Sequence, residues 1–131
     1  MKIEVIVLDI QVQKFKKSVI EKSRRLAGLL RKKGVIEVYL AGGKRMRKLN
    51  KKFLKKDRDT NVISLVSPDN FPDLILGEVY LNPLFIEKNG QDLDLMLAHG
   101  VLHILGYDHE KKNDRLKMEA KENLFLSKLK T

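Results

Sequence analysis

The sequence predicts an α+β (α/β) domain, in which a mixed four-stranded sheet is packed with about four to five helices. Strand-like and helix-like segments alternate along the 131 residues, and no repeat or low-complexity linker divides them. A chain of this length buries roughly two-thirds of its unfolded surface, enough for one core. The chain has no cysteine, so the core forms without disulfides. We therefore expect residues 1–131 to form a single domain.

Four segments are rich in β-branched residues and have the length of strands. They cover residues 2–10, 35–41, 61–67 and 76–82. The last two are joined by a loop that contains proline, which predicts that they form an antiparallel pair. The first segment is apolar like a signal sequence, but Glu4 and Asp9 interrupt it and no small-residue cleavage site follows. We interpret it as a strand.

Four further segments have the spacing of apolar residues that is typical of helices. They cover residues 14–34, 42–56, 93–106 and 115–129. Gly34 is expected to end the first of these helices and Gly106 the third, because glycine adopts the left-handed conformation that reverses a chain. The resulting order is β-α-β-α-β-β-α-α. It predicts right-handed crossovers, with the helices packed against the sheet.

The charge of the chain indicates two interpretations. Lysine and arginine outnumber aspartate and glutamate by 27 to 17, a net charge of +10, and such a field attracts polyanions such as nucleic acid. Surfaces rich in lysine and glutamate also occur in proteins from hot environments, so charge alone does not decide between the two. No stretch reaches the ~18 to 20 uncharged apolar residues that span a bilayer. We expect a soluble protein without a membrane partner, and the lack of cysteine fits the cytoplasm.

The segment "HGVLHILGYDH", residues 99–109, contains all three histidines of the chain. His99 and His103 are four residues apart, so on a helix they share one face and can bind one ion. A turn at Gly106 can bring His109 to the same ion as a third ligand. The spacing matches the metal ligands of metzincin proteases, and three imidazoles leave one tetrahedral position open for chemistry. Zinc is favoured, although nickel and copper also accept imidazole.

Gly100 separates this segment from the protease pattern. A metalloprotease has a glutamate after its first histidine, and that glutamate acts as the general base. Gly100 has no side chain that could take this role, so peptide cleavage is disfavoured. The missing carboxylate also removes a negative charge, which favours an anionic substrate such as a phosphodiester.

Three segments together resemble the YbeY family of bacterial endoribonucleases, also called rRNA maturation factors. The histidine segment looks like the signature of the family. "LNKKFLKKDRDTNVISL" is similar to an upstream family segment, and "LGEVYLN" is similar to the strand that follows it. The resemblance covers roughly the middle and C-terminal two-thirds of the chain, in order and spacing. It implies a zinc-dependent, single-strand-specific endoribonuclease that acts on ribosomal RNA and ribosomal subunits in the cytoplasm.

The resemblance also assigns roles to individual residues. It implies that His99, His103 and His109 bind zinc, and it places a strand beside the cleft. The residues of that strand that match the family are Thr60, Asn61, Val62 and Ser64. Leu54 stands where the family usually has an arginine. Arg47, Lys55 or Arg58 is therefore a candidate for the phosphate contact, within a segment from Lys44 to Arg58 that carries nine basic residues.

Candidates for catalysis and base stacking are less specific. Asp108 can accept the ring proton of a ligand histidine, and Ser64 lies on the strand beside the cleft; these two are our catalytic candidates. Glu78 and Glu110 are weaker candidates for proton transfer, and Phe71 and Tyr107 are possible stacking surfaces. Each of these residues also has an ordinary structural explanation.

Two other functions remain open at this stage. One is a non-cleaving ribosome assembly factor, in which zinc is structural and the basic face binds RNA; Leu54 favours it. The other is a different zinc hydrolase, such as a protease or a small-molecule amidase, which Gly100 disfavours. Neither the RNA cleavage site nor the general base follows from the sequence.

Overall fold

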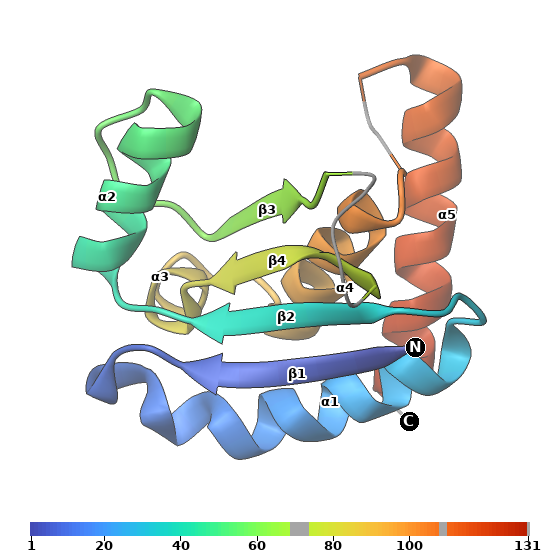
Figure 1. Ribbon diagram of the computed structural model, residues 1–131, viewed down its shortest axis with the longest axis horizontal. Helices are drawn as coiled ribbons and strands as arrows, with labels where there is room; N and C mark the ends of the chain where they lie inside the picture. The colour runs from blue at the N-terminus through green and yellow to red at the C-terminus, as the bar shows by residue number, and fades with distance from the viewer. Residues whose placement is uncertain (69–73, 108–109, 131) are drawn as a thin grey trace.

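The computed structural model describes residues 1–68, 74–107 and 110–130, and it confirms the predicted fold class. Four strands form one mixed sheet in the order β1-β2-β4-β3 (Figure 1). The strands are β1 (Lys2–Val7), β2 (Val35–Leu40), β3 (Val62–Val66) and β4 (Ile75–Leu81). β1, β2 and β4 are parallel, and β3 is antiparallel to β4, as the proline-containing loop predicted.

Five α-helices and one 3-10 helix are found in these described ranges. They are η1 (Ile10–Phe15), α1 (Lys16–Leu29), α2 (Gly43–Leu54), α3 (Pro83–Lys88), α4 (Leu93–Ile104) and α5 (Lys112–Leu129). The prediction omitted η1 and α3. A local signal for α3 was present, because the Asn82 side chain caps the helix by accepting the N–H of Phe85 and Pro83 occupies its first position. None of the described helices combines the length and apolar character needed to cross a membrane.

The predicted end of the first helix was wrong. The expected helix extended to Gly34, whereas α1 ends at Leu29 and Leu30 is already extended. The chain must leave the helix early because it has to return to the start of β2, where the N–H of Lys2 donates to the Gly34 carbonyl at 2.9 Å. Gly34 has a φ of 132° and lies against Leu76, so its conformation belongs to this return rather than to a helix stop.

The main core lies between one face of the sheet and helices α1, α4 and α5. α4 contributes most to it and lies between the sheet and α5 (Figure 1). Its buried residues are Leu97, Ala98, Gly100, Val101, Leu102 and Ile104. A smaller cluster on the other face packs Met46 of α2 against Ala41 and Ile63. Because α4 is packed on two sides, any side chain that it carries is held on a rigid support.

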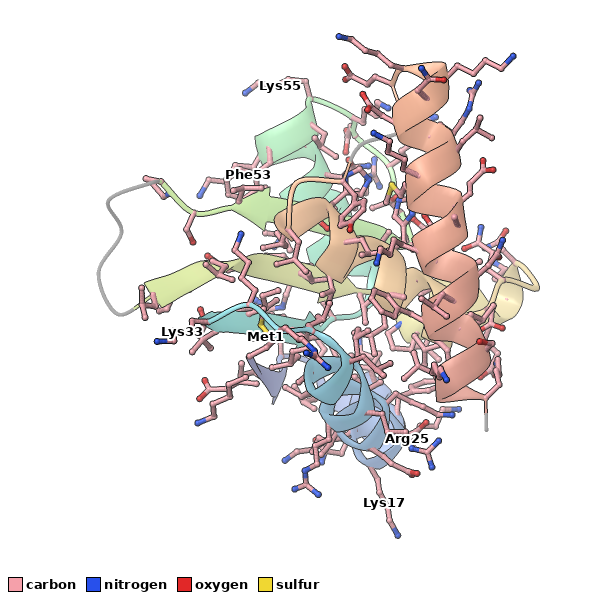
Figure 2. All side chains as sticks on the ribbon, turned by 90° about the vertical axis from the view of Figure 1, so that its right-hand side faces the viewer. Met1, Lys17, Arg25, Lys33, Phe53 and Lys55 are labelled. Atoms are coloured by element: carbon pink, nitrogen blue, oxygen red, sulfur yellow. The ribbon has the colours of Figure 1, made fainter. Side chains whose placement is uncertain are left out.

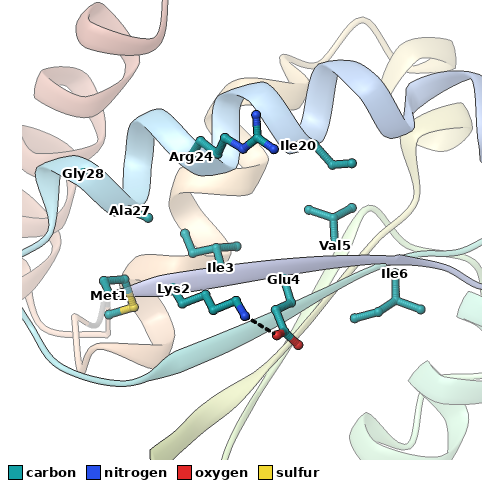
Figure 3. Close-up of a pocket in the computed structure, with 10 residues that line it drawn as sticks. All are labelled: Met1, Lys2, Ile3, Glu4, Val5, Ile6, Ile20, Arg24, Ala27 and Gly28. Carbon is teal, nitrogen blue, oxygen red and sulfur yellow. Dashed lines mark ion pairs between the residues drawn. The ribbon is translucent and has the colours of Figure 1, made fainter.

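A groove of about 670 Å³ runs between β1 and α1 (Figure 3). Apolar side chains such as Ile3, Val5 and Ile20 line it, and Lys2 and Glu4 form an ion pair of 3.0 Å at its side. β1 and β3 are the two outer strands of the sheet. The groove is therefore at the opposite edge of the sheet from β3, which together with β4 contacts α4.

Asp92 caps the N-terminus of α4. Its carboxylate accepts the N–H groups of Asp94 at 2.9 Å and Leu95 at 3.2 Å, and the Lys130 ammonium lies 3.0 Å away. Burial alone would raise the pKa of Asp92. Hydrogen bonds from Lys130 and from these two N–H groups outweigh the burial and lower the pKa below its usual range.

Replacing Asp92 should destabilise the protein in a pH-dependent way. We expect Asp92→Ala to lower the free energy of unfolding by about 0.5–2 kcal/mol at pH 7, because the cap is lost. A lowered pKa in the folded state means that ionised Asp92 stabilises the fold above its unfolded pKa of about 3.9, and that this contribution is lost as pH falls through the folded pKa. Urea unfolding at pH 7 and pH 3 measures both effects. Asp92→Asn, which keeps an acceptor oxygen, should retain part of the cap; equal losses at both pH values would contradict the assignment.

Candidate metal centre

His99 and His103 point toward one another from successive turns of α4. Their Nε2 atoms are 3.2 Å apart, and the ring centroids are separated by 4.6 Å at an interplanar angle of 76°. Two nitrogens bound to one zinc ion at 2.0–2.1 Å with tetrahedral angles would lie about 3.3 Å apart. The spacing of this pair therefore fits two ligands of a single ion.

Glu122 on α5 orients the first of these histidines. One of its carboxylate oxygens lies 2.9 Å from Nδ1 of His99, and the side chain of Glu122 is 14% exposed. A carboxylate in this place favours the tautomer that carries the proton on Nδ1, which leaves the Nε2 lone pair for a metal. Carboxylate–histidine pairs of this kind are common behind protein zinc ligands.

Gly100 brings this part of α4 directly onto the sheet. A Cβ atom at residue 100 would lie 2.6 Å from Val79 Cγ1, 3.2 Å from Val62 Cγ2 and 3.3 Å from Ser64 Oγ. The Ser64 hydroxyl donates to the Gly100 carbonyl at 3.1 Å. Gly100 therefore does more than omit the protease glutamate, since no side chain fits between α4 and the β3–β4 pair.

The third predicted ligand, His109, and the catalytic candidate Asp108 lie outside the described residues. Across residues 1–68, 74–107 and 110–130, no group of three or more His, Asp or Glu side chains is arranged to hold a metal ion. His99 and His103 fit two positions of a zinc site in their distance, their donor atoms and the carboxylate behind them.

The residues that match the family just before β3 and within it connect this part of the chain to α4 and the segment before α4. The Asn61 side chain donates to the Met96 sulfur at 3.3 Å and to Gln91 at 3.0 Å, and Ser64 donates to Gly100. Thr60 and Val62 flank these contacts, and their N–H groups donate to the side chains of the residues before them. The segment therefore positions the histidine helix beside the edge strand of the sheet.

The basic candidates lie on α2 and the segment that follows it, and all of them are exposed. Arg47 forms a salt bridge of 2.8 Å with Asp57. Lys55 ends α2 with a left-handed φ of 60°, and the carbonyl of Arg58 accepts a bond from buried Asn50. Leu54 is 49% exposed, so no packing role explains it. Arg47 is paired with an acid, while the predicted role of Lys55 and Arg58 in binding remains a prediction.

The weaker candidates have separate locations. Glu78 lies on β4 and accepts a hydrogen bond from Tyr80. The N–H of Tyr107 donates to the Leu102 carbonyl beyond the end of α4, where Gly106 has the predicted positive φ, at 98°. Glu110 is exposed before α5. Phe71 lies outside the described residues.

Glu122 is the candidate site residue that the sequence reasoning missed. It lies on the same side of α5 as Met118, Phe125 and Leu129, at the spacing of a helical stripe. A glutamate within an otherwise buried apolar stripe indicates a specific partner. That signal was available in the sequence, but it could not identify His99 as the partner.

Comparison with known proteins assigns the chain to a family. The family model described as "Endoribonuclease YbeY" matches residues 2–130. The chain belongs to the Endoribonuclease YbeY family. An Aquifex aeolicus protein named Endoribonuclease YbeY is 32% identical over 95% of this chain and 91% of its own length. A Thermodesulfovibrio yellowstonii protein of the same name is 37% identical over 73% of this chain and 67% of its own.

A solved structure supports the same assignment of fold. A Thermotoga maritima protein determined in solution is similar with a TM-score of 0.66 and 25% sequence identity. The match covers 97% of this chain and 88% of that protein. The sequence resemblance to the YbeY family is thus confirmed along nearly the whole chain, beyond the three segments that suggested it.

A methyl group at residue 100 should disturb both stability and the histidine pair. We expect Gly100→Ala to lower the free energy of unfolding by about 1–3 kcal/mol, because Val79 must shift or α4 must move away from the sheet. Gly28→Ala is the matched control, since a Cβ there meets nothing within 4 Å and should stabilise α1 by about 0.5–1 kcal/mol. Urea unfolding measures both variants. A stabilising effect of both substitutions would contradict the close contact at Gly100.

Proposed function

We propose that this protein is a zinc-dependent, single-strand-specific endoribonuclease that acts in ribosomal RNA maturation and ribosome quality control in the cytoplasm. The observation that supports it best is the convergence of His99 and His103, with Glu122 behind the first of them. Membership of the YbeY family supports the substrate class and the reaction. In this proposal His109 is the third zinc ligand.

The residues around the histidines suit an anionic substrate. A zinc ion held by the three histidines would supply a Lewis acid for phosphodiester hydrolysis. Residue 100 is a glycine, so the position that carries the glutamate in metalloproteases places no negative charge in the path of a phosphate. Glu122 is directed at Nδ1 of His99 and holds its ring. Ser64 has a positioning role through Gly100, and Asp108 is proposed to orient a ligand histidine in the same manner.

The exposed basic side chains of α2 and its following segment would bind the RNA backbone. Lys55 and Arg58 are the proposed phosphate contacts, with Arg47 contributing when RNA competes with Asp57 for its guanidinium. Surface ion pairs of this kind are weak, so a phosphate can replace the carboxylate at little cost. Such contacts supply affinity without reading sequence, and binding should weaken steeply with salt.

Removal of the metal or of one ligand should abolish RNA cleavage. We expect a chelator and His103→Ala each to reduce hydrolysis of single-stranded RNA by at least about 100-fold, because the ligand set is incomplete, while duplex RNA resists cleavage throughout. A digest of both RNA forms, combined with metal analysis of the purified protein, measures this. RNA binding without chelator-sensitive cleavage would favour the assembly factor. Cleavage of casein but not of RNA would favour another zinc hydrolase.

Loss of the carboxylate behind His99 should weaken zinc binding without removing a ligand. We expect Glu122→Gln to lower zinc affinity by about 10- to 100-fold, the usual effect of removing such a partner. Glu119→Gln is the control, since Glu119 is exposed on the same helix. Zinc affinity is measured by competition with a chromogenic chelator. Equal affinities of the Glu122 and Glu119 variants would show that Glu122 does not support the metal.

A further inference from the structure

Three glutamates form a row across the face of the sheet that is opposite to α4. Glu4 pairs with Glu37 between β1 and β2, and Glu37 pairs with Glu78 between β2 and β4. β2 and β4 carry the same tetrapeptide, "EVYL", in register, with the valine and leucine buried in the main core. In a chain of net charge +10, this places acidic groups side by side on one surface. Like charges in register oppose strand pairing, so the row calls for a functional explanation.

Two tyrosines hold the orientation of this row. Tyr39 and Tyr80 stack with ring centroids 4.9 Å apart at an angle of 14°. The Tyr80 hydroxyl donates to one carboxylate oxygen of Glu78. Burial and the bond to Glu78 raise the pKa of Tyr80 well above its ordinary value, so the hydroxyl remains a donor. Glu78 is thereby fixed and keeps free lone pairs for further donors.

A hollow of about 470 Å³ lies over this end of the row. This volume is within the range of about 300–1,000 Å³ that is typical of small-ligand sites. Among the described residues, its lining includes Glu37 and Glu78 of the row, Phe53 of α2, and residues 64–68 of β3 and the segment after it. Phe53 of α2 is 44% exposed, and Figure 2 shows it next to β3 and away from α5. The hollow thus combines an exposed aromatic ring with two carboxylates.

The hollow and the histidine helix lie on opposite sides of β3. Ser64 lines the hollow, and its hydroxyl donates to the carbonyl of Gly100, the residue after His99. Only the edge strand β3 separates the two sites, because α4 packs on one face of β3 and the hollow opens on the other. A single strand that crosses the edge of β3 can reach both.

The charges of the hollow select a base over a phosphate. Glu37 and Glu78 repel a phosphate, whereas the lysines of α2 attract one; the Lys52 ammonium, for example, lies over the Phe53 ring, 5.1 Å from its centroid. A carboxylate accepts hydrogen bonds only. Guanine presents two neighbouring donors, its ring N–H and its amino group. The donors of adenine, cytosine and uracil each have an acceptor beside them, which a carboxylate repels.

We propose that this hollow is a guanine-binding subsite for single-stranded RNA, in which Phe53 stacks on the base and Glu78 accepts its two neighbouring N–H donors. The proposal rests on the proposed RNA substrate and adds a base preference beside the cleavage site. It also gives the acidic row a role, because the carboxylates keep the RNA backbone on α2 and admit only the base.

The test compares the binding of four RNAs to the full chain. The probes are fluorescent 12-nucleotide oligouridylates with a central guanosine, inosine, adenosine or uridine, and affinity is measured by anisotropy with a chelator present to prevent cleavage. We expect guanosine to bind about tenfold more tightly than uridine. Inosine should lose most of this advantage, because it lacks the amino group while the protein is unchanged.

Variants of the protein locate the preference. Glu78→Gln should bind the guanosine and uridine RNAs within twofold of each other, and Phe53→Leu should weaken binding of all four RNAs by about tenfold, through lost stacking. Glu4→Gln is the matched control, since Glu4 belongs to the same row but does not line the hollow; it should keep the full preference.

Several outcomes would overturn the proposal. Equal affinity of the wild-type protein for all four RNAs excludes the subsite, and so does an equal loss of preference in Glu4→Gln and Glu78→Gln. An oligolysine peptide serves as the competing ligand. If it binds tightly, and if Glu4→Gln and Glu78→Gln weaken its binding equally, the row is a docking surface for a basic protein instead. Binding is measured with the chelator and cleavage without it, so the two results are independent. A guanine preference in a protein that does not cleave RNA would contradict only the proposed function. Chelator-sensitive cleavage without base preference would contradict only the subsite.

Discussion

The contact between α4 and the β3–β4 pair at Gly100 is the constraint on which the candidate site depends. With no side chain at this residue, the helix backbone rests on Val79 and accepts the Ser64 hydroxyl. This closeness fixes the rotation of α4 about its axis. His99 is thereby directed toward α5, where its ring contacts the Glu122 carboxylate. One glycine therefore sets both the depth and the direction of the histidine pair, and it also removes the carboxylate that peptide hydrolysis would use.

α5 also fixes α4, through polar contacts at two positions along the length of α4. Lys130 forms ion pairs with Asp92 and Asp94 at the beginning of α4, and Glu122 contacts His99 one to two turns later. The apolar stripe of α5 packs with α4 in the main core. Buried packing supplies most of the stability, while the polar contacts determine how the two helices are aligned. The histidine rings are consequently oriented by a neighbouring helix as well as by their own.

Charge is distributed unevenly over the face of the sheet that is opposite to α4, although the chain as a whole is strongly basic. Positive side chains gather on α2 and the segment after it, whereas Glu4, Glu37 and Glu78 share the open face. A polyanion is therefore attracted to one part of this surface and repelled from another. Net charge alone would suggest a uniform attraction. The register of the parallel strands creates the difference, because it places identical residues of β1, β2 and β4 next to one another.

The sequence by itself determined the strands, four of the helices and the facing histidine pair, because each follows from a local period in the chain. The helix predicted from Lys14 to Gly34 was too long at its C-terminal end. The prediction also omitted α3, although the sequence contains the Asn82–Pro83 pair that begins this helix. Only the tertiary structure decided the partners that are distant in sequence. His99 meets Glu122 23 residues away, Ser64 meets Gly100 36 residues away, and Glu37 meets Glu78 across two paired strands. Local propensity carries no information about such contacts, since they arise from strand register and from the packing of α4 between the sheet and α5.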